Sequence, residues 1–262
     1  MTFKREKREP LTSIVIPTYN GLHLLKEAIA SIRRSTKAPY ELIIVDNGST
    51  DGTIEYLQEH NIVFISHPAN TGFPVACNWG LRLARGEYLL LLNNDVLVTE
   101  HWLDNMLNHL MRDPKIGIIG PLSNYVSGKQ QIEMAGSYMD MAAKVMAEAR
   151  GQLEYANRVI GFCMLFRREL LQQVGWLDER FSPGHFEDDD YCYRARLAGY
   201  RVAIAKDTFV YHHGSASFKR GDQQAVISLL ARNRQLFIDK WGVDPHRFID
   251  SANQAQEDEG RR

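Results

Sequence analysis

The chain has 262 residues, of which 44% are apolar and 24% are charged, as in ordinary soluble globular proteins. Its formal net charge of −1 offers no general attraction for nucleic acid, so we expect no nucleic-acid partner. The three cysteines, Cys77, Cys163 and Cys192, form no Cys-x-x-Cys pair. This argues against a disulfide framework or a zinc cluster and fits a reducing cytoplasm.

The sequence contains no candidate membrane span or signal peptide. Its longest apolar stretch, residues 88–92, is far shorter than the roughly 20 residues that cross a bilayer. Residues 1–10 lack the apolar core of a signal peptide. We therefore expect a cytoplasmic protein without an integral membrane segment. Peripheral contact with the inner face of the membrane and a homodimer are both compatible with the sequence.

Residues 12–119 alternate short apolar runs with amphipathic segments, a pattern that predicts strands and helices in turn. The expected strands are residues 12–16, 41–45, 62–65, 88–92 and 116–119. The expected helices are residues 22–32, a helix capped by Ser49 or Thr50, residues 73–84 and residues 102–111. Near-continuous apolar strands between amphipathic helices indicate an α/β fold whose mostly parallel sheet is covered on both faces.

The second half of the chain is less regular. Residues 123–150 show no clear periodicity, and we expect a mobile loop there. The expected strands are residues 159–167 and 201–205, and the expected helices are residues 188–198 and 227–241. No Pro- or Gly-rich linker divides the chain, so we expect one continuous domain over residues 11–242, between a flexible N-terminus (1–10) and a C-terminal tail (243–262).

Polar residues directly follow three of the expected strands, at Pro17–Asn20, Asp46–Gly48 and Asn93–Asp95. Ligands of such sheets bind beyond the carboxyl ends of the strands. The Asp95 carboxylate suits Mg²⁺ or Mn²⁺, which prefer oxygen ligands; a helix cap is the alternative role. Asp46 fits either nucleotide binding or a turn, and Asn70 either nucleotide binding or a helix cap.

Adjacent His212 and His213 point to opposite faces of a strand, so at most one of them joins Asp95 in a metal site. A structural role is the alternative for either histidine. The sequence has no glycine-rich phosphate loop. A bound diphosphate therefore needs a metal ion, a basic side chain, or both.

The acidic run Glu187–Asp190, flanked by aromatic residues, is the candidate source of a general base. Asp188, placed just ahead of the predicted helix, is the first candidate, and Glu187 is its rival. Asp190 falls within the first helical turn, where we expect a structural role. The alternative for the whole run is favourable interaction with the helix dipole, worth roughly 0.3–1 kcal/mol per carboxylate.

Taken in order, these motifs resemble glycosyltransferase family 2, the inverting enzymes with a GT-A fold, over residues 12–241. The motifs that carry the resemblance are Ser13–Asn20, Ile43–Asp51, Asn70–Phe73 with Asn78, Leu91–Asp95, Gly161–Arg168 and Glu187–Asp190. One position departs from the family pattern, because Asn93 stands where the usual Asp-x-Asp motif has its first aspartate. Asn94 and Asp95 still offer an amide oxygen and a carboxylate.

The resemblance implies a Rossmann-like, mostly parallel sheet flanked by helices, with a smaller acceptor-side subregion. Residues 11–121 would bind the nucleotide sugar and residues 122–242 the acceptor. It implies a UDP- or dTDP-linked donor, Mn²⁺ or Mg²⁺ on Asp95 and His212, and Asp188 or Glu187 as the base. The donor-binding residues that it implies are Pro17, Thr18, Tyr19, Asn20, Asp46, Asn70, Gly72, Phe73, Asn78, Asn93 and Asn94.

Basic side chains near the end of the chain are further candidates for contact with phosphate. Lys219 and Arg220 lie in a Gly- and Ser-rich segment that we expect to close over the donor, and Arg232 and Arg234 lie on the last predicted helix. An ordinary solvated surface is the alternative for all four. The acceptor hydroxyl belongs to a glycan, a lipid-linked glycan, a protein or a small molecule, which the sequence does not distinguish.

Three other functions compete with this interpretation. A metal-dependent nucleotidyltransferase would place a basic, glycine-rich loop after the first strand, but Pro17–Gly21 contains no Lys or Arg. A catalytically silent sugar-nucleotide-binding subunit is compatible with Asn93. An NAD-dependent oxidoreductase would need the glycine fingerprint that is missing after Ile16.

Overall fold

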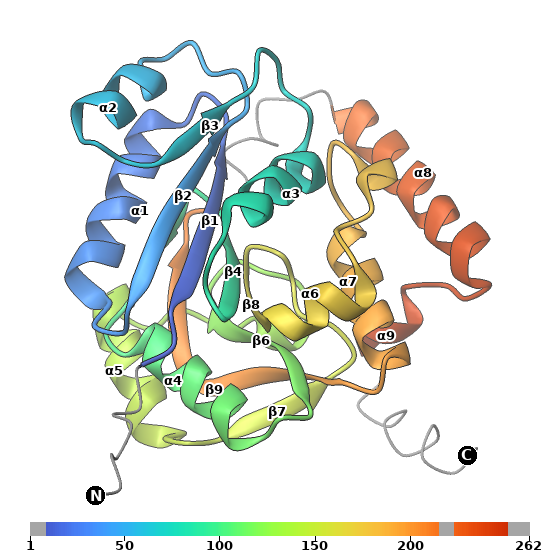
Figure 1. Cartoon of the computed structure of the whole chain (residues 1–262). Helices are drawn as coiled ribbons and strands as arrows, with labels where there is room; N and C mark the ends of the chain where they lie inside the picture. Colours follow the sequence, from blue (N-terminus) through green and yellow to red (C-terminus); the bar gives the residue numbers. More distant parts are fainter. Residues whose placement is uncertain (1–8, 215–222, 251–262) are drawn as a thin grey trace, which may run out of the picture.

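The computed structural model describes residues 9–214 and 223–250 (Figure 1). Over these residues, nine strands form one sheet in the order β3-β2-β1-β4-β8-β6-β9-β5, with β7 pairing to β9 off this path. The strands are β1 (Thr12–Thr18), β2 (Tyr40–Asp46), β3 (Phe64–Ser66), β4 (Tyr88–Leu92), β5 (Val96–Leu97), β6 (Ile116–Ser123), β7 (Leu153–Ala156), β8 (Cys163–Arg167) and β9 (Arg201–His212).

The sheet is mixed, and its first four strands along the chain are parallel. Strands β3, β2, β1 and β4 run parallel to their neighbours, whereas β8 runs antiparallel to both β4 and β6. Strand β9 is parallel to β6. The C-terminal ends of β1, β2, β4, β6 and β9 therefore meet the N-terminal end of β8 at one edge of the sheet. This edge holds the polar residues that follow the strands.

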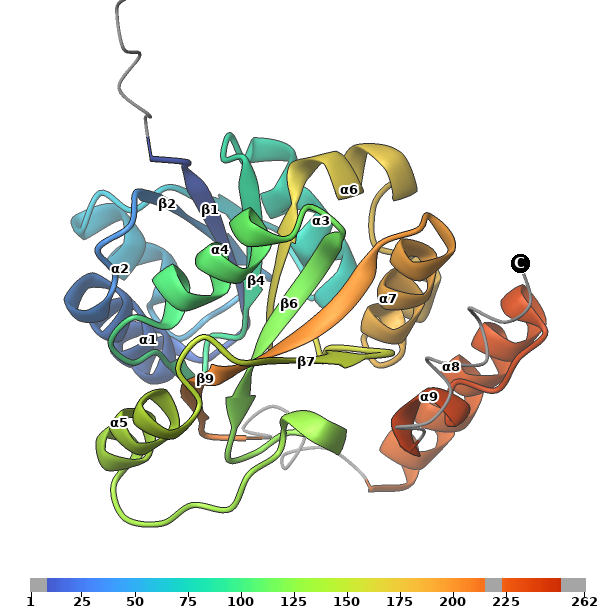
Figure 2. The same ribbon diagram turned by 90° about the horizontal axis from the view of Figure 1, so that it is seen from below.

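Helices cover both faces of the sheet (Figures 1 and 2). The helices are α1 (Leu22–Ser35), α2 (Thr53–Glu59), α3 (Phe73–Leu83), α4 (Trp102–Arg112), α5 (Tyr138–Glu148), α6 (Arg168–Val174), α7 (Glu187–Leu197), α8 (Gln223–Trp241) and α9 (Arg247–Asp250), and the 3-10 turns are η1 (Gly128–Gln130) and η2 (Glu179–Phe181). Among the described residues, none of the helices combines the length and apolar character needed to cross a bilayer.

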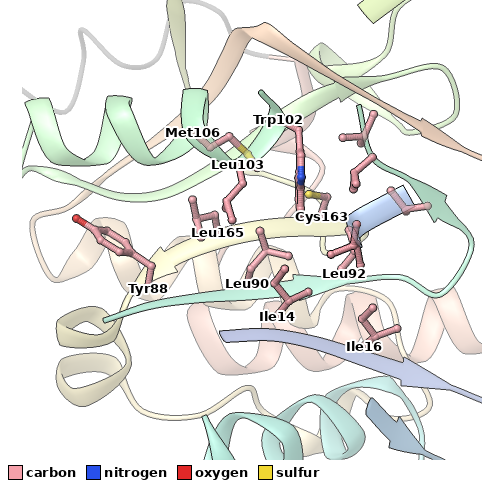
Figure 3. Packing of buried hydrophobic residues seen from close by; sticks show 14 of the residues in the cluster. Ile14, Ile16, Tyr88, Leu90, Leu92, Trp102, Leu103, Met106, Cys163 and Leu165 are labelled. Atoms are coloured by element: carbon pink, nitrogen blue, oxygen red, sulfur yellow. The ribbon is translucent and has the colours of Figure 1, made fainter. Parts of the chain in front are cut away.

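Alternate strand residues supply the two hydrophobic cores, because successive side chains of a strand point to opposite faces. Ile14 and Leu90 pack with α1 and α4 on one face, in the cluster shown in Figure 3. Val15 and Leu91 pack with α3, α6 and α7 on the other face. Both faces are buried, so residues 14–16 of β1 and 89–92 of β4 form unbroken apolar runs, as expected for strands covered on both sides.

The mostly parallel α/β sheet predicted from the sequence is confirmed, with local differences. The segment 123–150, expected to be a mobile loop, contains η1 and α5, and α5 begins at a Ser137 side chain that caps the Asp140 amide. Neither Ser49 nor Thr50 caps α2, whose N-cap is Gly52 in the left-handed region at φ 87°. The strand expected over residues 159–167 starts only at Cys163.

Gly80 sets the distance between α3 and the sheet. A Cβ atom at this position would lie 2.3 Å from Cγ1 of Val15 and 3.0 Å from Cγ2 of Val45. Both valines are fully buried, so neither can move aside without disturbing the core. The glycine lets α3 lie directly on β1 and β2, and it fixes the height of the helix start at Phe73 above the strand ends.

We expect Gly80→Ala to destabilise the fold by up to about 2 kcal/mol. The overpacking cost of about 1–3 kcal/mol exceeds the roughly 1 kcal/mol that alanine gains over glycine in a helix. Urea unfolding followed by circular dichroism measures the difference. The control is Gln172→Ala on the exposed side of α6, which should leave the midpoint unchanged or raise it. A Gly80→Ala variant as stable as the wild type would contradict the close contact.

Candidate active site

A cavity of about 890 Å³ opens at the edge where the strand ends meet. Its wall includes twelve of the seventeen residues singled out from the sequence. They are Pro17, Thr18, Tyr19, Asn70, Gly72, Phe73, Asn93, Asn94, Asp95, Glu187, Asp188 and His212. Residues 95 and 188 are far apart in the chain, yet both line this one cavity. The fold thus brings the candidate metal ligand and the candidate base to the same space.

Asp95 and His212 form a pair inside the cavity. Strand β5 pairs antiparallel with β9, with Val96 opposite His212. As a result, Nε2 of His212 lies 3.1 Å from Oδ1 of Asp95. The other ring nitrogen, Nδ1, is 2.7 Å from the carbonyl oxygen of Tyr125. A proton on Nδ1 that is donated to this carbonyl leaves the Nε2 lone pair facing the Asp95 carboxylate.

The second histidine points elsewhere. Nε2 of His213 lies 3.3 Å from a carboxylate oxygen of Glu27 on α1, outside the cavity wall. His212 stacks instead on Phe162, with ring centroids 5.1 Å apart. Of the two adjacent histidines, His212 is therefore the one that faces the cavity.

The Asp95–His212 pair fits a divalent cation. Neighbouring ligands of an octahedral ion with bonds of about 2.1 Å lie about 3.0 Å apart, close to the 3.1 Å between these two donor atoms. Within residues 9–214 and 223–250, the structure has no group of three or more His, Cys, Asp or Glu side chains that could hold a metal. Such an ion would take its remaining ligands from phosphate oxygens and water, as Mg²⁺ commonly does.

Asp188 is held by two backbone amides. Its Oδ2 accepts a hydrogen bond from the Gly161 N–H at 2.8 Å, and its Oδ1 accepts one from the Asp189 N–H at 2.9 Å. Helix α7 begins at Glu187, so Asp188 lies within the first turn and not ahead of the helix as expected. The carboxylate still lines the cavity. The two amides fix its orientation there.

The four acidic residues of the run differ in environment. Burial, followed by the charge of Asp188, raises the pKa of Glu187 well above its usual range, and Oε2 of Glu187 has no hydrogen-bond partner among the described residues. Burial and Asp188 also raise the pKa of Asp189 to about 7, although Arg158 lowers it. Asp190 accepts hydrogen bonds from Lys240, Trp241 and Arg194. Asp190 is thus structural, as expected from the sequence.

A strained turn precedes Asp188. His185 and Phe186 both have positive φ angles, 72° and 70°, which non-glycine residues rarely adopt. The side-chain amide of Asn233 on α8 is fully buried and donates to the carbonyls of Phe181, Gly184 and His185, at 2.7, 2.7 and 3.0 Å. This single side chain ties α8 to the turn that leads into Asp188.

Five of the residues singled out from the sequence do not line the cavity. Asp46 is buried and accepts from the amides of Gly48 and Ser49, the turn role that was its alternative. The Asn78 side chain bonds Leu177 and Glu179. The other three are Asn20, Arg232 and Arg234. The proposed lid residues Lys219 and Arg220 lie outside the described residues.

Asn20 and the two arginines have partners of their own. The Asn20 side chain accepts from the Thr50 amide, and Arg232 donates to the Ser182 carbonyl. Arg234 pairs with Asp244. None of these three side chains lines the cavity. Each makes a contact within the protein, whereas the sequence analysis placed Asn20 at the donor and the two arginines at phosphate.

The sequence analysis assigned no role of their own to several residues of the cavity wall. Asn47 supports the Asn70–Phe73 turn, because its side chain bonds Asn70, Thr71 and the Gly72 carbonyl. Its place directly after Asp46 was the only available signal. Arg158 lies in an irregular segment without a motif, and only the fold brings it to the cavity.

Comparison with known proteins gives a consistent result. The sequence profile of the family described as Glycosyl transferase family 2 matches residues 13–175. The O-antigen biosynthesis protein RfbC of Myxococcus xanthus is 29% identical over 233 residues, which cover 81% of this chain and 18% of that protein. The N-acetylglucosaminyl-diphospho-decaprenol L-rhamnosyltransferase of Mycobacterium tuberculosis is 28% identical over 256 residues, which cover 86% of this chain and 82% of that protein.

Solved structures show the same fold. A mannosyltransferase of Pyrobaculum calidifontis in complex with GDP-Man and Mn²⁺ superposes with a TM-score of 0.62 at 22% identity, covering 81% of this chain and 59% of that chain. The likeness confirms the GT-A architecture expected from the sequence. The chain spans less than a third of the length of the first two relatives, at 28% and 18%.

We expect Asn233→Ala to lower stability by about 1–3 kcal/mol, because it removes the buried amide that donates to the carbonyls of Phe181, Gly184 and His185. Gln235→Ala, on the same helix with a single exposed contact to Asp239, is the matched control and should change stability by less than about 0.5 kcal/mol. Urea unfolding of both variants makes the comparison. Equal midpoints for the two variants would show that the Asn233 amide does not brace the turn.

Proposed function

Because the chain belongs to glycosyl transferase family 2, we propose that it is a glycosyltransferase that uses a nucleotide-sugar donor, and we propose a specific reaction for it. It moves a hexosyl or deoxyhexosyl group from a UDP- or dTDP-linked donor to an acceptor hydroxyl with inversion of configuration. The observation that carries this proposal is the shared cavity of the Asp95–His212 pair and Asp188. One wall suits a diphosphate with its cation, and the other suits proton transfer.

Asp188 acts as the general base in this proposal. It removes the proton of the acceptor hydroxyl while the oxygen attacks the anomeric carbon and the bond to the departing diphosphate breaks. The raised pKa of Glu187 favours its protonated form, which cannot accept a proton, so Glu187 is less suited to this role. Two neighbouring carboxyl groups with different environments commonly divide such roles. The amides of Gly161 and Asp189 keep the Asp188 carboxylate pointed at the acceptor.

Asp95 and His212 hold the divalent cation in this proposal. Mn²⁺ or Mg²⁺ there supplies Lewis-acid stabilisation of the charge that develops on the diphosphate. Thr18 positions Asn94, because the Asn94 amide donates to the Thr18 hydroxyl at 2.9 Å. Holding both substrates in one cavity also replaces a two-body encounter by a reaction within one complex.

We expect Asp188→Asn to lower turnover by about 10²–10⁴-fold, the contribution typical of general-base catalysis. Donor affinity should stay within a few-fold, because the residue serves the acceptor. The assay is release of UDP or dTDP from a panel of nucleotide sugars, with Mn²⁺ present and water or a hydroxyl acceptor. Asp104→Asn on α4, outside the cavity wall, controls for loss of a carboxylate. Unchanged turnover in Asp188→Asn, or no release by the wild type with any donor, would refute this function.

We expect Asp95→Ala to weaken Mn²⁺-dependent UDP binding by more than about tenfold, since a ligand of the cation is lost. UDP binding without metal should change little. Calorimetric titration of UDP with and without Mn²⁺ separates the two quantities. If Mn²⁺ strengthens UDP binding equally in the variant and the wild type, Asp95 does not hold the ion.

A further inference from the structure

Arg158 is the one Arg or Lys side chain among the described residues that line the cavity. Its Nη1 lies 3.2 and 3.3 Å from the two carboxylate oxygens of Asp189, and its Nη2 donates to the Ser127 hydroxyl at 2.9 Å. Its side chain is 12% exposed. The guanidinium is thus fixed in place and still reaches the cavity.

The contacts of Arg158 leave it able to bind an anion. A guanidinium has five N–H donors in a rigid fork, and contacts with one carboxylate and one hydroxyl do not use them all. Burial and the charge of Asp188 raise the pKa of Asp189 to about 7, so this partner is only partly ionised near neutral pH. Arg158 therefore keeps positive charge that an anionic ligand can meet.

The position of Arg158 favours the acceptor over the donor. Its partner Asp189 directly follows Asp188, the proposed base, which must contact the acceptor hydroxyl. Arg158 also precedes Gly161, whose amide holds the same base. The donor diphosphate already has a binding site at the Asp95–His212 pair, where β5 pairs with β9. A negatively charged group on the acceptor would lie beside the acidic run, so it would need a positively charged side chain to offset the repulsion. Among the cavity-lining Arg and Lys residues that the structure describes, Arg158 is in that position.

We propose that Arg158, with Ser127, forms a subsite for a phosphate or diphosphate group carried by the acceptor. The inference rests on the proposed function, and it names the chemistry of the acceptor at that site. A phosphate accepts two parallel N–H bonds from a guanidinium, which positions the acceptor as well as binding it. The group would fix the acceptor hydroxyl in reach of Asp188.

Apolar side chains at the same cavity suit a hydrocarbon chain attached to that phosphate. Leu230 of α8 lines the cavity and is 37% exposed, and Ile227, one turn earlier, is 54% exposed. Helix α8 lies beside α7, the helix that carries the base (Figures 1 and 2). A lipid-linked phosphate and a water-soluble phosphate ester share the chemistry of the subsite. They differ in whether these two side chains contribute to binding.

Calorimetric titration with inorganic pyrophosphate, in EDTA to remove the metal-dependent contribution, tests the subsite in the full chain. The double variant Arg158→Gln/Asp189→Asn removes both charges and leaves no uncompensated carboxylate, so it guards against simple unfolding. We expect it to bind pyrophosphate at least about tenfold more weakly. UDP affinity in Mn²⁺ should stay within about threefold, which a donor role for Arg158 would not allow.

Arg85→Gln, an exposed arginine paired with Glu41 outside the cavity, is the matched charge control and should bind pyrophosphate as the wild type does. Equal pyrophosphate affinity in the double variant and the wild type would overturn the subsite. So would a parallel loss of UDP–Mn²⁺ affinity, which would place Arg158 on the donor. If the proposed function itself is wrong, the wild type will release no nucleotide from any donor in the turnover assay, a result that is independent of pyrophosphate binding.

Farnesyl diphosphate, titrated under the same conditions, assigns the source of the phosphate. Binding at least about tenfold tighter than pyrophosphate, with the gain lost in Leu230→Ser, supports the subsite and makes its ligand lipid-linked. Equal binding of the two probes, with both weakened by the Arg158 double variant, supports the subsite for a water-soluble ester. Tight farnesyl diphosphate binding that survives the double variant would overturn the role of Arg158.

Discussion

Two hydrogen bonds donated by backbone amides, next to the start of β8, connect the segment that carries Asp95 with the helix that carries Asp188. The Asn93 N–H donates to the carbonyl of Phe162 at 2.8 Å, and the next amide back, that of Gly161, donates to Asp188 at 2.8 Å. Strand β8 pairs with β4 directly beside this point, with Cys163 opposite Leu92. The motif that carries Asp95 and the helix that carries Asp188 are thus fixed to the adjacent residues Phe162 and Gly161.

The four carboxyl groups of the acidic run lie at the start of α7 and are stabilised in different ways. The cost of burying each carboxyl group is reduced by different partners or by protonation. Burial favours the protonated form of Glu187, Asp189 pairs with Arg158, and Asp190 accepts hydrogen bonds from Lys240 and Trp241 of α8. Asp188 is left with backbone amides and an open side toward the cavity. The helix N-terminus favours negative charge at all of these positions.

The sequence predicted the features that follow from periodicity and strand-end position. Apolar runs located the central strands, and the residues at the ends of β1 and β4 located Pro17, Thr18, Tyr19, Asn93, Asn94 and Asp95 in the cavity wall, because parallel strands end at one edge. It could not separate Asp46 and Asn78 from ligand-binding neighbours, since their hydrogen bonds depend on turns and contacts far along the chain. It also missed Arg158 and Asn233, which lie outside any motif. Only the packing of α8 and α7 gives Asn233 three carbonyls to brace.

The account stands on one cation-binding pair that holds the donor diphosphate and one base that deprotonates the acceptor, both in the same cavity. A crystal structure of the protein with UDP and Mn²⁺ tests this most directly. The account predicts Mn²⁺ bound to Oδ1 of Asp95 and Nε2 of His212, with the β-phosphate turned across the cavity toward the Asp188 carboxylate. An ion held by other side chains, or a β-phosphate that points away from Asp188, would contradict it.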